Sequence, residues 1–223
     1  MKNAVIGRLG KIKRSSVSEE IILLSPEDER VKSIEENTDN LFIPIDLAGD
    51  FIGKKNVKVY FDLELYPFFQ SMKDVITTDG KSKGVLRLRR TLSGHDRESV
   101  MVGDLFVLSS VAGEAEEIKV LSTDRGTIPY HVILTIRFSG GKMAHLEYTF
   151  GEGAERIEFE WSGIQTIAEF DSDEMNPITP IGITSLPLVY YAEDILEKSY
   201  TADVAFHEQL ERYKTVVKGG GSE

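Results

Sequence analysis

The sequence contains no cysteine among its 223 residues. This absence excludes disulfide bonds, thiolate catalysis and zinc sites built on thiolates. Long hydrophobic runs are missing as well. Met1, Lys2 and Asn3 are followed by a short apolar stretch that is too brief for a signal peptide, and no later run reaches transmembrane length. The sequence therefore favours an intracellular, cytoplasmic protein.

Positive charge is scarce. The chain has 26 Lys and Arg residues against 37 Asp and Glu residues, and its formal net charge is -11. A surface with this balance repels nucleic-acid phosphates and anionic lipid headgroups, and no basic run is long enough to form an offsetting patch. We therefore expect neither nucleic acid nor a membrane as a partner. A charged fraction of 28% and a hydrophobic fraction of 41% predict a globular fold.

Patterns for metal binding are also lacking. The four histidines are scattered, without a spacing that would place two of them on one ion. Acidic clusters occur at 27–29, 114–117 and 171–174, but none has the spaced oxygen ligands that a hard cation needs. We expect these clusters to be solvated turns and helix starts, and we predict no metal site.

Residues 1–66 have the pattern of a small α/β unit. Short apolar runs at 4–6, 21–24, 41–43 and 57–61 predict strands, and the first three lack alternation, as buried parallel strands do. Ser25 and Pro26 indicate the start of a helix between two of these strands. The connections after Gly7 and after Asp46 lack helical periodicity, which leaves little room for the crossover helices of a parallel sheet.

Residues 67–223 predict a larger, mostly antiparallel open sheet with helices on one face. Pro67 opens a helix that we expect to end at Gly80, and Thr201 can cap a helix near the end of the chain. Period-two alternation marks strands within 132–138, 144–150, 157–161 and 167–170. The buried face of the last helix should carry Phe206, Leu210, Tyr213 and Val217. The fold class predicted is α+β, with a Rossmann-like α/β unit at the N-terminus.

Several landmarks follow one another in the order seen in a known family. They are Lys58-Val59-Tyr60-Phe61 through Tyr66-Pro67-Phe68, Met72 to Gly80, Gly84 to Arg87, Asp104 to Gly113-Glu114, and Ile136 to Gly141. In this order the chain resembles the glucose-fructose oxidoreductase and inositol dehydrogenase family, Gfo/Idh/MocA. The resemblance implies a shortened dinucleotide-binding-like domain at 1–66 and the family's C-terminal sheet domain at 67–223.

The residues that such enzymes use for catalysis are not found at the matching positions. The family's Glu-Lys-Pro motif corresponds to Pro44-Ile45-Asp46, which offers no ammonium group. Its Asp-x-x-x-His pair falls on 99–103, where no residue can exchange a proton at neutral pH. Glu64 stands where an arginine is often found. The resemblance thus indicates a truncated and catalytically degenerate member.

The dinucleotide fingerprint is also incomplete. Gly7 and Gly10 give Gly-x-x-Gly after the first strand, and Arg8 stands in place of the motif's middle glycine. The usual Gly-x-Gly-x-x-Gly needs its middle glycine so that the backbone can approach the pyrophosphate. We interpret Gly7 and Gly10 as turn glycines and predict no cofactor, with NAD or NADP as the alternative.

The resemblance places any surviving ligand in a cleft between the two domains. We expect this cleft to be lined by Asp46, Glu64, Tyr66, His95 and Asp104. Because these groups include several carboxylates, they favour a neutral polyol or a cation over a phosphorylated sugar. His95 is also the best single candidate for proton handling, although a surface loop explains it more simply. The alternative for the cleft is a collapsed junction filled by aromatic side chains.

The sheet face left bare by alternation predicts a homo-oligomer, as in the resembled family. Its expected members are Ile133, Thr135, Arg137, Glu147, Thr149, Glu158 and Glu160, with Arg137 pairing with a glutamate across a two-fold axis.

Three hypotheses about function follow from the sequence. The first is a non-catalytic structural or regulatory homo-oligomer or small-ligand binder. The second is an NAD(P)-dependent oxidoreductase acting on a sugar or polyol, and the third is an accessory subunit of a full-length family enzyme.

Overall fold

The computed structural model describes residues 2–15, 21–34, 37–51, 54–78, 83–93, 96–174, 184–185 and 187–219. The chain forms two compact units. Unit 1 comprises Met1–Phe69 and Leu188–Glu211, and unit 2 comprises Gln70–Pro187 and Arg212–Glu223. The division is therefore not the contiguous one expected from the sequence, because the segment 188–211 belongs to unit 1.

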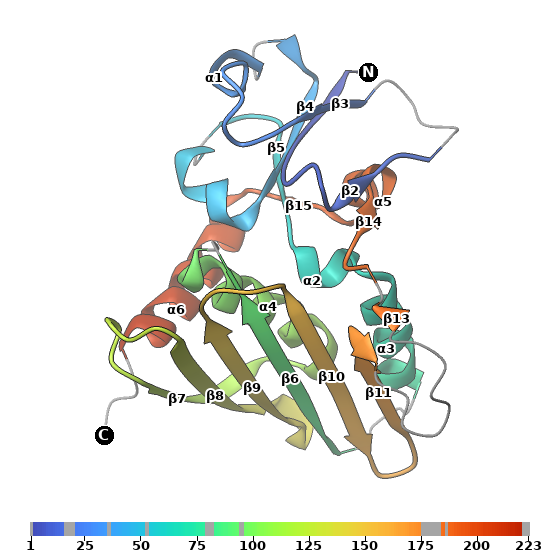
Figure 1. The fold of residues 1–223 in the computed structure, drawn as a ribbon, viewed down its shortest axis with the longest axis vertical. Helices are drawn as coiled ribbons and strands as arrows, with labels where there is room; N and C mark the ends of the chain where they lie inside the picture. Colours follow the sequence, from blue (N-terminus) through green and yellow to red (C-terminus); the bar gives the residue numbers. More distant parts are fainter. Residues whose placement is uncertain are drawn as a thin grey trace. The chain divides into compact units, whose positions relative to one another are not determined.

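Unit 1 is built on a five-stranded sheet with the order β15-β5-β4-β1-β3. Its elements are β1 (Asn3–Ile6), β2 (Ile12–Lys13), β3 (Ile21–Leu24), α1 (Val31–Ile34), β4 (Asn40–Pro44), the 3-10 helix η2 (Ile45–Phe51), β5 (Val57–Tyr60), α2 (Asp62–Leu65), β14 (Tyr190–Tyr191), α5 (Ala192–Lys198) and β15 (Tyr200–Thr201). The four strands β3, β1, β4 and β5 are parallel, and β15 pairs antiparallel to β5. Figure 1 shows the four parallel strands in blue and cyan, and β15 in the orange of the later residues.

The expected strands of this unit are confirmed, and their apolar runs are buried. Ala4, Val5 and Ile6 of β1 are fully inaccessible to solvent, as are Ile43 of β4 and Val59 of β5. A strand buried on both faces does not need alternation, which explains why these runs are continuous. The sheet remains parallel although its connections are short. β2 follows β1, and η2 follows β4.

The helix expected to begin at Ser25 begins instead at Val31. The reason is local, since Asp28 accepts hydrogen bonds from the backbone and the guanidinium of Arg30. An aspartate that bonds the backbone two residues further on stabilises a turn in competition with a helix. Residues 25–30 are therefore turns.

Unit 2 contains a six-stranded sheet with the order β11-β10-β6-β9-β8-β7. Its elements are α3 (Pro67–Thr78), which starts in unit 1, then β6 (Gly84–Leu92), α4 (Arg97–Ala112), β7 (Ala115–Ser122), β8 (Tyr130–Phe138), η3 (Ser139–Gly141), β9 (Met143–Phe150), β10 (Arg156–Gly163), β11 (Ile167–Asp171), β12 (Asp173–Glu174) and β13 (Thr184–Ser185). All neighbours in the sheet are antiparallel except β6 and β9. The expected mostly antiparallel sheet and the α+β fold class are confirmed.

One face of this sheet is covered and the other is open. Leu86, Leu88, Leu134, Leu146 and Trp161 are buried on the covered face, together with most of α4. Residues that alternate with them are half-buried or exposed, as period-two strands require. Trp161 is the single tryptophan of the chain, and it is fully buried. It packs over Gly84, where an added Cβ would overlap its ring.

The last helix, α6 (Val204–Gly219), carries the expected buried face of Phe206, Leu210, Tyr213 and Val217. Its cap differs from the prediction. Asp203 accepts a hydrogen bond from the backbone N–H of Phe206 at 2.8 Å, whereas Thr201 pairs with Lys58 in the sheet of unit 1. A carboxylate is as good an N-cap as a threonine hydroxyl, and the strand pairing draws Thr201 away from the helix. Gly80, the expected end of α3, lies outside the described residues.

Candidate functional site at the carboxyl edge of the parallel sheet

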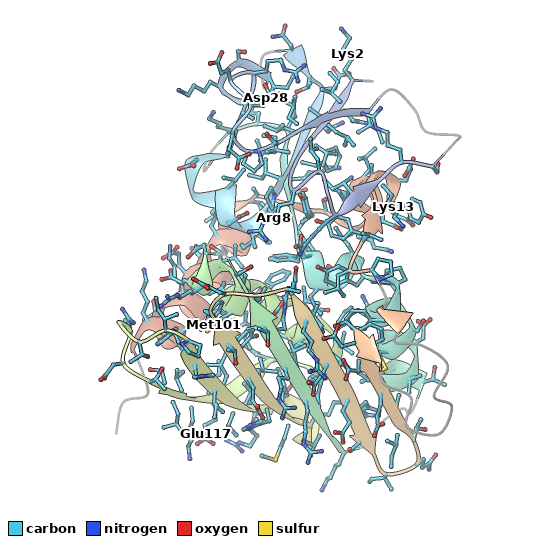
Figure 2. All side chains as sticks on the ribbon, in the orientation of Figure 1. Lys2, Arg8, Lys13, Asp28, Met101 and Glu117 are labelled. Atoms are coloured by element: carbon cyan, nitrogen blue, oxygen red, sulfur yellow. The ribbon has the colours of Figure 1, made fainter. Side chains whose placement is uncertain are left out.

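The strand order of unit 1 defines a topological switch point. From β1 the chain moves outward to β3, then returns to the other side of β1 to form β4. In open parallel sheets, ligands bind at the carboxyl ends of the strands beside such a point. Here Gly7 and Arg8 follow β1, Asp46 lies just after β4, and Asp62 comes soon after β5. Figure 2 labels Arg8 at this edge of the sheet.

Four side chains form a polar cluster at this edge. The Lys11 ammonium donates to Asp62 Oδ2 at 3.1 Å and to the Tyr66 hydroxyl at 2.9 Å. The Tyr190 hydroxyl donates to the other oxygen of Asp62, Oδ1, at 2.7 Å. The side chains of Lys11 and Asp62 are 15% and 22% exposed, so the ion pair is partly shielded from water. Asp62 thus joins Lys11, near the N-terminus, to Tyr190, which lies near the start of the second segment of unit 1.

Electrostatics keep the phenols of this cluster protonated. Burial raises the pKa of Tyr190 well above its ordinary value, and the charge of Asp62 raises it further. Burial also raises the pKa of Tyr60, with Asp62 and Asp46 adding to the rise and Arg8 opposing it. Both tyrosines therefore act as neutral hydrogen-bond donors. The influence of Asp46 and Arg8 on one phenol also indicates that their charges act at the same edge.

The structure explains Gly7 by packing. A Cβ at Gly7 would overlap the Tyr60 hydroxyl, and the Ile12 side chain also lies close. Tyr60 itself donates to the carbonyl oxygen of Ile6 at 2.8 Å. Gly10, in contrast, has open space where a Cβ would point. Gly7 is therefore required by the close approach of a protein side chain.

The segment after β1 differs from that of a dinucleotide-binding domain. A Rossmann fold places a helix there, and its N-terminus holds the pyrophosphate. In this chain Leu9 and Gly10 form a turn closed by a hydrogen bond from the Lys11 N–H to the Arg8 carbonyl, and β2 follows. Within residues 2–15 no helix begins. These residues do not provide the helix N-terminus that a dinucleotide would need.

Three of the expected cleft residues lie in unit 1. Tyr66 joins the polar cluster through Lys11, and Asp46 lies in the first turn of η2. Glu64 is almost fully buried in α2, where its carboxylate accepts a hydrogen bond from the Tyr200 hydroxyl at 3.0 Å. Pro44-Ile45-Asp46 carries no ammonium group, but the carboxyl edge of the sheet does have one. Lys11 supplies this ammonium group. Lys11 lies in a different segment from Pro44-Ile45-Asp46, which was matched to the family's Glu-Lys-Pro motif.

Asp104 lies in unit 2, in a buried ionic network. Arg90 contacts both oxygens of Asp104 at 2.7 and 2.9 Å, and the Tyr148 hydroxyl donates to Asp104 at 3.2 Å. Arg90 also contacts Glu155 at 2.9 Å. Arg90 and Tyr148 offset the cost of burying this carboxylate, so Asp104 serves the interior of unit 2. His95 lies outside the described residues.

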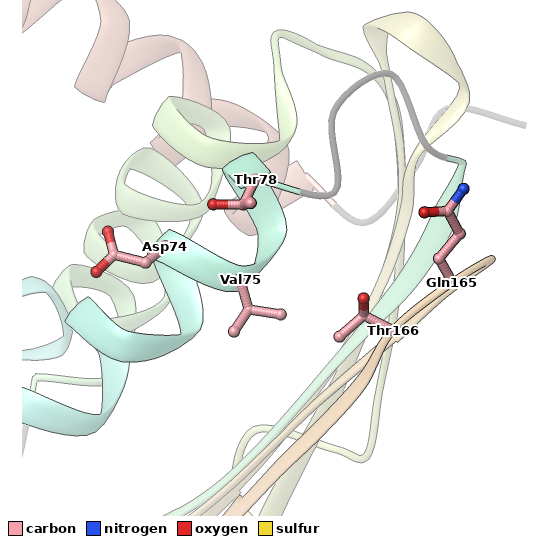
Figure 3. Close-up of a pocket in the computed structure, with 5 residues that line it drawn as sticks. All are labelled: Asp74, Val75, Thr78, Gln165 and Thr166. Atoms are coloured by element: carbon pink, nitrogen blue, oxygen red, sulfur yellow. The ribbon is translucent and has the colours of Figure 1, made fainter.

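The stretch 99–103 lies within α4 and carries no group that titrates near neutral pH. Elsewhere in unit 2, a groove of about 390 Å³ lies between α3 and the turn joining β10 to β11. Figure 3 shows the residues that line it. Among the described residues that line it, Asp74 is the charged one. Across the described parts of the chain, no group of three or more His, Asp or Glu side chains could hold a metal ion, and no helix is long and apolar enough to cross a membrane.

Comparison with known proteins gives a similarity of structure alone. No family model matches the sequence, and no curated protein is similar to it in sequence. A dehydrogenase from Chromobacterium violaceum has a TM-score of 0.56 at 10% identity, over 99% of this chain and 94% of the other. UDP-N-acetylglucosamine 3-dehydrogenase GnnA from Acidithiobacillus ferrooxidans has a TM-score of 0.54 at 13% identity, over 99% and 96%. A myo-inositol dehydrogenase from Corynebacterium glutamicum has a TM-score of 0.50 at 16% identity, over 91% and 71%.

These similarities define the class of fold, in which a Rossmann-like parallel sheet is combined with a separate, mostly antiparallel sheet. It is the fold of the Gfo/Idh/MocA-type dehydrogenases. The resemblance drawn from the landmarks at 58–68, 72–80 and 136–141 is therefore confirmed at the level of the fold. At these identities the likeness carries no information on substrate.

Sequence reasoning missed Lys11, Asp62 and Tyr190. Asp62 had a usable signal, because it follows a predicted parallel strand and carboxyl ends of such strands meet at one edge. Lys11 had a weaker signal, its place just after the Gly7 and Gly10 turn. Tyr190 is 128 residues from Asp62 in the chain, and no local pattern links the two.

Proposed function

We propose that this chain is a homologue of the dehydrogenase fold that has lost catalysis and dinucleotide binding, and that it binds a small neutral polyol or sugar at the carboxyl edge of unit 1. One observation carries this proposal. The segment after β1 forms a turn and β2 where the fold's enzymes need a phosphate-binding helix, and Tyr60 packs over Gly7. A ligand without a pyrophosphate does not need that helix.

The charges of the edge favour a neutral ligand. Arg8 and Lys11 contribute two positive charges, and Asp46 and Asp62 contribute two negative ones. Because these charges balance, the edge has no net charge that would attract a phosphorylated sugar or a polyamine. The same set presents ammonium and guanidinium donors beside carboxylate acceptors, which suits hydroxyl groups because each hydroxyl both donates and accepts.

Calorimetric titration with NADH and with NADPH tests the loss of the cofactor. We expect no binding tighter than roughly 100 µM, which corresponds to about -5.5 kcal/mol. Either dinucleotide binding more tightly than this would overturn that part of the proposal. The binding of a polyol would not be affected by this result, so the two parts can fail separately.

A thermal-shift screen of inositols, hexoses and sugar phosphates tests the ligand. A ligand at about 100 times its dissociation constant stabilises the folded chain by about 2.7 kcal/mol. We expect Lys11→Met to abolish the shift for a neutral polyol and Lys13→Met, on the exposed side of β2, to retain it. Preferential stabilisation by sugar phosphates, or an equal loss in both variants, would contradict the proposed site.

The second candidate function is an NAD(P)-dependent oxidoreductase acting on a CH–OH group. The hydrogen bond between Lys11 and Tyr66 favours it, because an ammonium beside a phenol can support proton transfer. Substrate-dependent reduction of NAD or NADP by the purified chain, lost in Tyr66→Phe, would establish this function. If reduction needs a co-purified full-length dehydrogenase, the chain is an accessory subunit.

We also propose that a second copy of the chain covers the open face of the unit 2 sheet. This face carries both signs of charge. Arg89 contacts Glu147 at 2.9 Å and Glu158 at 2.7 Å, and Arg87 contacts Glu160 at 2.7 Å. Because such a surface is electrostatically complementary to itself, a two-fold contact can pair its charges across the axis. Arg137 lies near Glu116 and Glu117 of its own chain, at 3.6 and 3.4 Å.

A further inference from the structure

Unit 2 contains a cleft that the proposed function does not use. It has a volume of about 380 Å³ and is formed by the first turns of α4, the segment before β8 and the end of α6. Its apolar wall consists of Met101, Tyr130 and Val217, which are 4%, 7% and 8% exposed. We call it the α4–α6 cleft. Its size suits a small organic molecule.

Two arginines line this cleft, Arg97 and Arg125, and the contacts of their guanidinium groups are to an aromatic ring and to backbone carbonyl oxygens. Arg97 lies over the Tyr130 ring at 4.8 Å and donates to the carbonyl oxygen of Arg125 at 3.2 Å. Arg125 donates to the carbonyl oxygen of Lys218 at 3.1 Å. Within the part of the chain that the structure describes, neither guanidinium forms an ion pair with a carboxylate.

This state is unusual within unit 2. The other arginines of this unit each form an ion pair with a carboxylate; these are Arg87, Arg89, Arg90, Arg137, Arg156 and Arg212. The chain has a formal net charge of -11, so carboxylates are in excess. Two guanidiniums at one cleft that form no ion pair with a carboxylate of the described residues therefore point to a place for an external anion.

The acidic residues of the cleft are already engaged. Glu98 contacts Lys218 at 3.1 Å and Lys214 at 3.6 Å. Asp96 caps α4 by accepting hydrogen bonds from the backbone N–H groups of Glu98 and Ser99. Because these carboxylates serve lysines and the helix cap, they leave the charges of Arg97 and Arg125 available to a ligand.

The cleft lies on a different side of α4 from the position that the resembled family uses for catalysis. At about 3.6 residues per turn, Arg97 and Met101 project from one side of the helix. Ser99 and Gly103, which match the family's catalytic pair, project from roughly the opposite side. The cleft is therefore separate from that position on the helix.

We propose that the α4–α6 cleft binds a small organic anion that has a carboxylate or phosphate group and an apolar or ring portion. The anionic group is held by Arg97 and Arg125, whose planar guanidiniums match the two oxygens of such a group. The apolar portion packs against Met101 and Val217. This site is independent of the carboxyl edge of unit 1.

The test is a calorimetric titration of the full chain with benzoate, phenyl phosphate and inorganic phosphate, with benzyl alcohol as the neutral analogue. We expect benzoate or phenyl phosphate to bind with a dissociation constant of about 1 mM or tighter. The preferred probe distinguishes a carboxylate ligand from a phosphate ligand. Equal binding of benzyl alcohol, or no binding of either aromatic anion at about ten times that concentration, would overturn the proposal.

Matched variants locate the binding. Arg97→Gln and Arg125→Gln should each weaken the preferred anion at least tenfold, on the order of one lost charge-assisted contact. Arg212→Gln, which removes an exposed arginine of α6 paired with Glu114, should leave the affinity unchanged. Arg125 is exposed, so its replacement should preserve the fold, which the emission of Trp161 reports. A similar loss in all three variants would show that the anion responds to overall charge instead.

Discussion

The hydroxyl of Tyr60 donates a hydrogen bond to the carbonyl oxygen of Ile6 at 2.8 Å in the interior of unit 1. This bond joins the last residue of β5 to the last residue of β1. The same hydroxyl lies so close to Gly7 that a Cβ at this position would overlap it. A single buried phenol thus links β5 to β1 and explains why position 7 is a glycine.

Tyr60→Phe should destabilise unit 1. The substitution leaves the Ile6 carbonyl buried without this donor, which costs about 1–3 kcal/mol. Urea unfolding followed by circular dichroism measures the change. Tyr191→Phe, at a tyrosine that is 45% exposed, is the control and should be within about 0.5 kcal/mol of the wild type. Equal stability of all three proteins would show that the bond contributes nothing.

Much of the fold was predictable because its signals are local. The continuous apolar runs at 4–6, 21–24 and 41–43 predicted buried parallel strands, and the alternation at 132–138 and 144–150 predicted strands with one open face. Competing hydrogen bonds explain the two wrong boundaries. Asp28 stabilises a turn where a helix was expected, and the pairing of Thr201 with Lys58 leaves Asp203 to cap α6.

The Arg90 and Asp104 pair predicts a large effect of removing either partner. Arg90→Leu leaves the carboxylate of Asp104 buried with its charge uncompensated, and we expect a loss of about 3–5 kcal/mol. The double variant with Asp104→Leu should recover much of this loss. Arg87→Leu removes an exposed ion pair and should cost less than about 1 kcal/mol.

Trp161 makes this comparison specific to unit 2, because it is the single tryptophan and lies in the core of that unit. Its fluorescence during urea unfolding reports the stability of each variant. If Arg90→Leu and Arg87→Leu had equal midpoints, the buried pair would have no special role.

The candidate site was less predictable than the fold, for a physical reason. Asp62 follows a parallel strand, so its place at the carboxyl edge could be anticipated. The partner Tyr190 reaches Asp62 only because the segment 188–211 belongs to unit 1, which no periodicity or spacing reveals. Lys11 lies in a turn whose path depends on the pairing of β2 with β14. Pairing between distant segments, and not residue type, therefore determines which residues meet at the site.

Glu147, on the open sheet face, should make the stability of the folded chain depend on pH. The hydrogen bond from Arg89 holds the pKa of Glu147 below its ordinary value of 4.5 in the folded chain. Because the folded-state pKa is the lower one, the stabilisation is complete above the unfolded-state pKa and is lost as pH falls through the folded-state pKa. Titration of the carboxyl carbon by NMR should show the pKa of Glu147 rising toward 4.5 in Arg89→Gln and staying low in Arg212→Gln. An unchanged pKa in Arg89→Gln would exclude Arg89 as the cause.

The proposed two-fold contact through the open face predicts concentration-dependent association. The face is lined by half-buried and exposed residues of β8, β9 and β10, including Thr135, Arg137 and Glu160. Sedimentation at tens of micromolar, roughly the range in which weak specific dimers form, should detect a dimer. Arg137→Glu places a third negative charge beside Glu116 and Glu117 and removes the positive charge expected to face a glutamate across the axis, so it should shift the equilibrium to monomer.

The matched control makes the same charge change away from this face. Arg212 lies on α6, and its side chain is 57% exposed, close to the 56% of Arg137. Arg212→Glu should therefore leave the dimer intact. Raising the salt concentration should weaken the wild-type dimer if charge pairs across the axis contribute. The Debye length is about 8 Å at physiological ionic strength and shortens as salt is added, so attraction between exposed charges decreases. A wild-type protein that sediments as a monomer at every concentration would remove the contact, and with it the regulatory role that a homo-oligomer would serve.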